Sequence, residues 1–78
     1  MSKVIEKKLG REKAYGMVLH PSKKIYIDPR QTPKSYLGTL IHEKLHVMFP
    51  DWSESKVKKT EKELANLLWE SGYRKVMQ

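Results

Sequence analysis

The chain contains no cysteine, which excludes disulfide bridges and thiolate metal ligands. Any metal site must therefore be built from histidine nitrogens and carboxylate oxygens. A sequence without cysteine also agrees with a reducing compartment, and we expect the protein to be cytoplasmic.

Long apolar runs are missing as well. The longest uninterrupted one is Val47-Met48-Phe49, whereas a membrane-spanning helix needs about 20 residues. The segment MSKVIEKKLG has no apolar core of about 7–15 residues, so we expect neither a signal peptide nor a membrane segment. At 78 residues the chain fits one domain, 1–78. So short a chain buries only about 60–65% of the surface that its unfolded form exposes.

Acidic residues are outnumbered, with nine Asp and Glu against sixteen Lys and Arg, for a formal net charge of +7. This excess favours anionic partners such as nucleic acid or an acidic protein. The basic residues are spread along the chain, however, so a solvated, highly charged surface is the simpler interpretation. Aromatic residues for base stacking are few, which weakens the nucleic-acid interpretation.

The first half of the chain predicts a β-hairpin. Residues 15–20 and 25–27 have the composition of strands, and the Pro21-Ser22-Lys23-Lys24 segment between them is typical of a turn. Residues 2–13 are mostly charged and predict either a short helix ending at Gly10 or a loose edge segment.

The second half predicts two helices. Thr32 and Pro33 mark a helix start, and Pro50 ends that helix after Phe49. A second helix is expected over 53–71, capped by Asp51 or Ser53, with Gly72 behind it. The short connection makes the helices antiparallel neighbours, so we expect an α+β fold, a small β-hairpin or sheet packed on two antiparallel helices. An apolar stripe through Leu45 and Met48 should face the core.

The chemistry is concentrated in His42-Glu43-Lys44-Leu45-His46, an H-E-x-x-H pattern within the first helix. His42 and His46 are four residues apart, so both imidazoles project from adjacent turns of one face and can reach one ion. Two neutral imidazoles bind Zn²⁺ at about 2.0–2.1 Å. Glu43 would act as the catalytic base that accepts a proton from the attacking water and passes it to the leaving amine.

A catalytic zinc keeps three protein ligands, so a third is needed beside the two histidines. Glu54 returns close to His46 after the chain reversal, whereas Glu61 would lie nearer the level of His42. Antiparallel pairing permits either, and capping of the second helix would also account for Glu54. The remaining candidates are weaker: His20, Asp28, Asp51 and Glu63. Three tyrosines could stabilise an oxyanion, although packing is the simpler role for each: Tyr26, Tyr36 and Tyr73.

These residues resemble the minimal core of the zincin-like, glutamate-type metallopeptidases. The similarity covers about residues 15–73, and it extends to short phage and bacterial HExxH proteins with an "HExxH…FPD-x-SE" run, here His42 through Glu54. The resemblance favours Glu54 as third ligand and implies that the strand at 25–28 aligns the substrate backbone. It implies a zinc-dependent peptidase acting on a peptide or protein. The alternative is a non-catalytic basic module that binds nucleic acid or an acidic protein and uses a structural metal.

Overall fold

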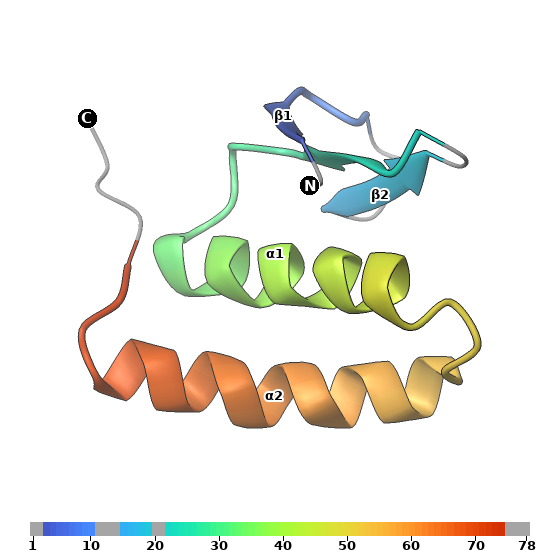
Figure 1. The fold of residues 1–78 in the computed structure, drawn as a ribbon. Helices are drawn as coiled ribbons and strands as arrows, with labels where there is room; N and C mark the ends of the chain where they lie inside the picture. Colours follow the sequence, from blue (N-terminus) through green and yellow to red (C-terminus); the bar gives the residue numbers. More distant parts are fainter. Residues whose placement is uncertain (1–2, 11–14, 20–21, 75–78) are drawn as a thin grey trace.

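The computed structural model describes residues 3–10, 15–19 and 22–74. Its elements follow the order β1 (Val4–Glu6), β2 (Gly16–Leu19), β3 (Lys24–Ile27), α1 (Pro33–Met48) and α2 (Glu54–Glu70). They form three layers, with the sheet on one side, α1 in the middle and α2 on the other side (Figure 1). The expected α+β fold is therefore confirmed.

The sheet has the strand order β1-β3-β2, so β3 is the central strand. The predicted hairpin is present: β2 pairs antiparallel with β3, with Met17 opposite Tyr26. Lys23 adopts a φ of 59° in the turn, and the neighbouring residues 20–21 lie outside the described part of the chain. On its other side β3 pairs in parallel with β1, Val4 opposite Ile25.

Of the two alternatives for the N-terminal segment, the helix was wrong over Val4–Glu6, which form a paired strand at an edge of the sheet. Val4 and Ile5 are β-branched residues, which suit the pleated backbone of a strand. The charged neighbours Lys3 and Lys7 are also held, since Ile25 N–H donates to the carbonyl of Lys3 and Lys7 N–H donates to that of Ile27.

The helix boundaries agree closely with the sequence prediction. Thr32 caps α1 by accepting a hydrogen bond from Ser35 N–H at 3.2 Å, and Pro33 begins the helix. Ser53, and not Asp51, caps α2, accepting from Lys56 N–H at 3.1 Å.

The end of α2 has the expected glycine geometry. Gly72 has a φ of +88°, and the N–H groups of Gly72 and Tyr73 donate to the carbonyls of Trp69 and Leu68. These two bonds satisfy carbonyls that the helix itself leaves unpaired.

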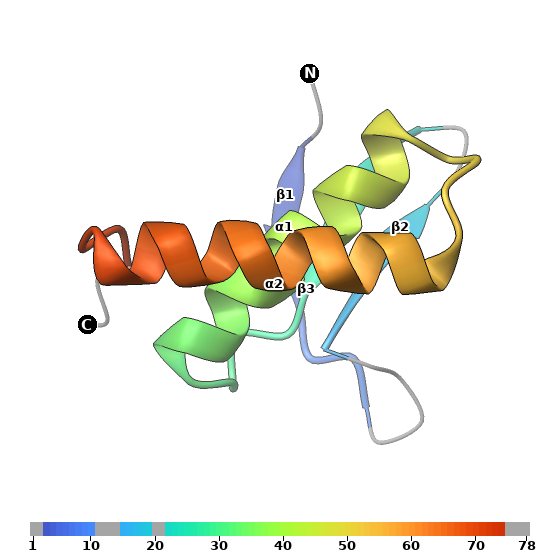
Figure 2. The same ribbon diagram turned by 90° about the horizontal axis from the view of Figure 1, so that it is seen from below.

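The layers meet only through α1. Ile25, Ile27 and Tyr36 form the core between the sheet and α1, whereas Val57, which is 0% exposed, anchors α2 on the opposite side of α1. The expected packing of a small sheet with two helices is thus present, with α1 lying between the sheet and α2. Met48, expected in the core stripe, is 53% exposed because it lies at the open end of α1. Seen from below, α2 crosses α1 obliquely (Figure 2).

Candidate functional site

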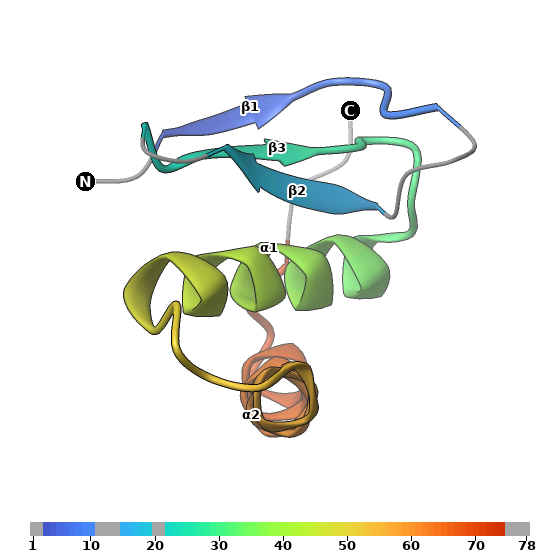
Figure 3. The same ribbon diagram turned by 90° about the vertical axis from the view of Figure 1, so that its right-hand side faces the viewer.

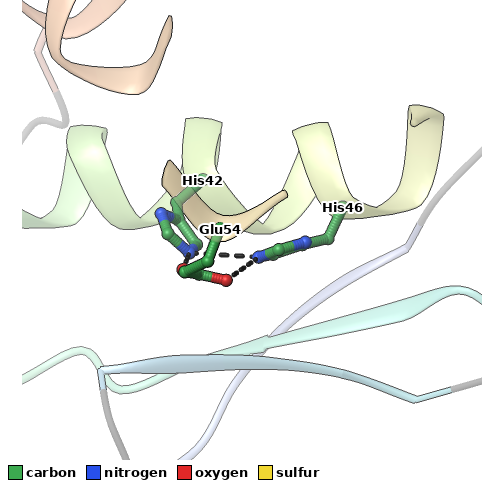
Figure 4. A group of neighbouring side chains, drawn as sticks. All are labelled: His42, His46 and Glu54. Atoms are coloured by element: carbon green, nitrogen blue, oxygen red, sulfur yellow. Dashed lines mark hydrogen bonds and ion pairs between the residues drawn. The ribbon is translucent and has the colours of Figure 1, made fainter. Parts of the chain in front are cut away.

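Three side chains meet where the end of α1 faces the start of α2. Nε2 of His42 and Nε2 of His46 are 3.2 Å apart. One carboxylate oxygen of Glu54 lies 2.7 Å from the His42 nitrogen, and the other lies 3.1 Å from the His46 nitrogen (Figure 4). These residues form a group whose donor atoms all lie within 4.8 Å of one another and could hold a metal ion.

The turn between the helices explains why Glu54 returns to the histidines. The rings of Phe49 and Trp52 stack at 4.3 Å with an interplanar angle of 8°, and Trp52 N–H donates to the Phe49 carbonyl. Ser53 then fixes the first turn of α2 by capping it. Glu54 is the first residue of that turn, where a carboxylate also interacts favourably with the helix dipole.

Glu61 lies on the other side of the same imidazole. Its carboxylate is 2.8 Å from Nδ1 of His42, away from the nitrogen that faces Glu54. Gly38 makes room for it, because a Cβ at that position would lie 2.8 Å from Oε2 of Glu61. A carboxylate on one ring nitrogen fixes the tautomer of a histidine and orients its other nitrogen toward a ligand. This arrangement favours Glu54 as a metal donor and gives Glu61 an orienting position, which the sequence did not predict.

Glu43 lies between the group and strand β2. It is 9% exposed, and burial raises the pKa of its carboxyl, an effect that nearby Glu54 and Glu61 reinforce and that His42 and His46 oppose. Its neighbour across the interface is Gly16, where a Cβ would lie 3.0 Å from Cγ of Glu43. The glycine therefore lets β2 approach α1 closely at this carboxylate.

Glu43 also borders two hollows that flank the group. One, of about 160 Å³, is lined by Tyr15, Gly16, Thr39, His42, Glu43 and Glu61. The other, of about 230 Å³, is lined by Val18, Glu43, His46 and Pro50. The carboxylate of Glu43 thus has access to space on the His42 side and on the His46 side.

The strand beside this site is β2, an edge strand of the sheet (Figure 3). The resemblance implied that residues 25–28 align a substrate backbone. Strand β3 occupies those residues, and its backbone is already paired with β1 and β2. Among the described residues, the unpaired strand edge near the site belongs to Gly16–Leu19 and not to residues 25–28.

The weaker ligand candidates either lie away from this group of side chains or fall outside the described residues. Asp28 accepts hydrogen bonds from the Arg30 side chain and from Leu9 N–H. The Arg30 guanidinium holds the pKa of the Asp28 carboxyl well below its usual range. Asp51 and Glu63 are exposed and do not belong to the group of His42, His46 and Glu54. His20 lies outside the described residues.

The tyrosines proposed as oxyanion donors are engaged in other ways or lie away from the group. Tyr36 donates its hydroxyl to Glu6 at 2.7 Å, and Tyr26 lies in the central strand beneath Lys7. Tyr73 follows the far end of α2 and is 65% exposed. In the described lining, the tyrosine that borders the His42 hollow is Tyr15, which precedes β2 and which no sequence pattern marked as a candidate.

The arrangement could hold a metal ion. Two imidazole nitrogens and a carboxylate converge, one imidazole is oriented from behind, and a buried carboxylate stands beside them. No helix among the described residues is long and apolar enough to cross a membrane. Comparisons with protein-family models, with curated proteins and with solved structures find no match to this chain.

Proposed function

We propose that the protein is a small zinc-dependent metallopeptidase of zincin-like type, in which His42, His46 and Glu54 hold one metal ion. The observation that carries the proposal is the 3.2 Å separation of the two Nε2 atoms, with the Glu54 carboxylate 2.7 and 3.1 Å from them. Two donors at about 2.0–2.1 Å from a tetrahedral zinc ion lie about 3.3 Å apart. The 3.2 and 3.1 Å separations are close to this value and the 2.7 Å separation is shorter, so the donor set supports Zn²⁺ as the proposed ion, with one position left open.

Each residue has a role in peptide hydrolysis. A bound zinc ion would supply Lewis-acid chemistry, lowering the pKa of water and polarising the peptide carbonyl. Glu43 would take the proton of the attacking water at its carboxylate and deliver it to the leaving amine nitrogen. Glu61 would hold the Nδ1 proton of His42, so that Nε2 stays free to bind.

Strand β2 would hold the substrate. Its outer edge offers backbone N–H and C=O groups to an extended peptide, in the manner of strand addition. Gly16 and Val18 place that edge beside Glu43 and His46. A substrate bound there would run past the metal-binding group.

The proposal is tested by metal content and by one conservative substitution. Elemental analysis of purified protein should find about one Zn²⁺ per chain, lost in His42→Ala and in Glu54→Ala. Glu43→Gln should retain the zinc but fail to hydrolyse fluorescently labelled casein. Glu63→Gln, on an exposed position of α2, should retain the zinc and still hydrolyse casein. The proposal would be contradicted if the protein took up no zinc and its melting temperature changed with neither zinc nor EDTA.

A second candidate is a non-catalytic basic binding module in which the metal serves folding. It is favoured by the net charge of +7 and by four exposed lysines on α2, namely Lys56, Lys58, Lys59 and Lys62. Binding to nucleic acid through phosphates would weaken steeply with salt. A gel-shift titration at low salt separates the two candidates. The binding module requires a complex with nucleic acid, whereas a zinc-dependent peptidase does not. A cytoplasmic location accompanies both candidates and rests on the cysteine-free composition.

A further inference from the structure

A larger hollow continues from the His42 side of the site toward the start of α1. It has a volume of about 630 Å³ and lies between the first half of α1 and the middle of α2, with Tyr15 at its border. It shares Tyr15, Thr39 and Glu61 with the smaller hollow beside His42 and Glu43. A chain lying along β2 past the metal-binding group would therefore pass directly into it.

The lining of this hollow is basic. Three exposed lysines reach it from two helices, Lys34 from α1 and Lys58 and Lys62 from α2. The only acidic residue in its described lining is Glu61, whose carboxylate is already engaged by Nδ1 of His42. The uncharged lining is mostly polar and able to form hydrogen bonds: Tyr15, Thr32, Ser35, Thr39 and Asn66. We refer to this region as the basic hollow.

The opposite side of the site differs in character. There the hollow is about 230 Å³ and combines Val18 and Pro50 with His46 and Glu43. No lysine or arginine belongs to its described lining. The two sides of the site thus offer different surroundings to the two halves of a bound peptide.

We propose that this protein selects peptides that place an acidic side chain in the basic hollow, on the His42 side of the site. The inference rests on the proposed peptidase function and adds the substrate class to it. A carboxylate there would face Lys34, Lys58 and Lys62, while small or apolar residues occupy the side of Val18 and Pro50. Nucleic acid is a poorer occupant, because the described lining of the hollow offers a single aromatic residue, Tyr15, for base stacking.

The expected preference is moderate because the lysines are exposed. A solvent-exposed ion pair changes an equilibrium by about two- to fivefold. We therefore expect a preference of about tenfold for glutamate over glutamine when more than one lysine takes part. That preference should shrink as salt is raised from about 0.02 M to about 0.5 M, since the charges are screened.

The test measures binding and cleavage separately. Zinc-loaded Glu43→Gln protein is titrated into ten-residue peptides of small and β-branched residues that carry a neutral dye. A single Glu, Gln or Lys is placed at each position in turn, and fluorescence anisotropy reports affinity. We expect tighter binding for glutamate at one or two adjacent positions on one side of the peptide. The combined Lys34→Ala, Lys58→Ala and Lys62→Ala variant should lose the preference, while Lys59→Ala, on the same helix but outside the hollow, should keep it.

The outcomes separate this inference from the proposed function. Equal affinity for the Glu and Gln peptides, or no measurable binding of either, would overturn the preference. Displacement of the Glu peptide by an equally charged single-stranded DNA at lower concentration would also overturn it in favour of a nucleic-acid site. If the preference holds in binding but wild-type protein cleaves none of the peptides, the substrate site stands and the peptidase proposal fails. Equal cleavage of Glu and Gln peptides would leave the peptidase without this selectivity.

Discussion

Gly38 and Glu61 meet where the two helices cross: a Cβ on residue 38 would lie 2.8 Å from Oε2 of Glu61. The missing side chain on α1 is therefore what lets a carboxylate of α2 come within 2.8 Å of the Nδ1 of His42. The position of one glycine thus controls the orientation of one proposed metal ligand.

Replacement of Gly38 by alanine should separate folding from metal binding. Alanine favours a helix interior over glycine by about 1 kcal/mol, so the metal-free protein should be at least as stable as wild type in urea denaturation. The flexible Glu61 carboxylate should move aside, and the zinc affinity should fall by about tenfold or more, as measured by competition with a fluorescent zinc indicator. A fall in stability with unchanged affinity would show that the glycine serves packing alone.

Replacement of Glu61 by glutamine should produce the same loss of zinc affinity without changing helix propensity. The amide can still approach Nδ1 but cannot provide the charge that makes His42 a stronger ligand. Nitrogen chemical shifts of His42 should report a mixture of tautomers in place of the Nδ1-protonated form. Glu63→Gln on the same helix is the matched control, because Glu63 is exposed and lies outside the proposed metal site.

Replacement of Ser53 by alanine should affect both the second helix and the site. The hydroxyl caps α2 by accepting from Lys56 N–H, and loss of such a cap costs about 1 kcal/mol. Because Glu54 is the next residue, fraying of the first turn should also weaken zinc binding. Ser55→Ala, an exposed position within α2, should change neither the urea midpoint nor the zinc affinity by a comparable amount.

Local sequence signals were enough to predict much of this structure. The caps Thr32 and Ser53 act through hydrogen bonds three residues away, so the helix boundaries follow from adjacent residues. His42 and His46 share a face because of helical periodicity alone. Glu54 could be placed near them because only seven residues separate it from His46 in the chain.

The features that escaped prediction depend on distant parts of the chain. Val4 pairs with Ile25 in parallel, and no local pattern identifies the partner of a three-residue strand. That pairing makes β3 the central strand, which in turn makes β2 the edge beside the site. Whether Glu61 reaches Nε2 or Nδ1 of His42 is decided by how α2 crosses α1 at Gly38.

Replacement of Val57 by alanine should loosen the second helix from the first. Val57 is 0% exposed, and α2 is held only by α1 among the described layers. Loss of buried methyl groups, with the cavity left behind, should lower the free energy of unfolding by about 2 kcal/mol. Leu67→Ala removes a larger side chain that is 61% exposed and should cost far less. Equal losses in urea denaturation would mean that α2 packs by a different face.

Alkaline titration should reveal the contact between Tyr36 and Glu6. Burial, with the hydrogen bond to Glu6 as a second cause, raises the pKa of the Tyr36 hydroxyl to about 12. An unfolded tyrosine has a pKa of about 10. Below about pH 10 the Tyr36 hydroxyl is protonated in both the folded and the unfolded chain, so its contribution to stability is fully present. Between about pH 10 and 12 only the unfolded chain loses this proton, so stability falls as the pH rises.

The measurement compares wild type with Tyr36→Phe. Absorbance near 295 nm follows the ionisation of the four tyrosines, and the wild-type curve should contain a late component that the variant lacks. The variant should be less stable at pH 8, because the hydrogen bond to Glu6 is gone. Between pH 10 and 12 its stability should decline less steeply than that of wild type. Parallel declines would place the Tyr36 hydroxyl in water and contradict its position against β1.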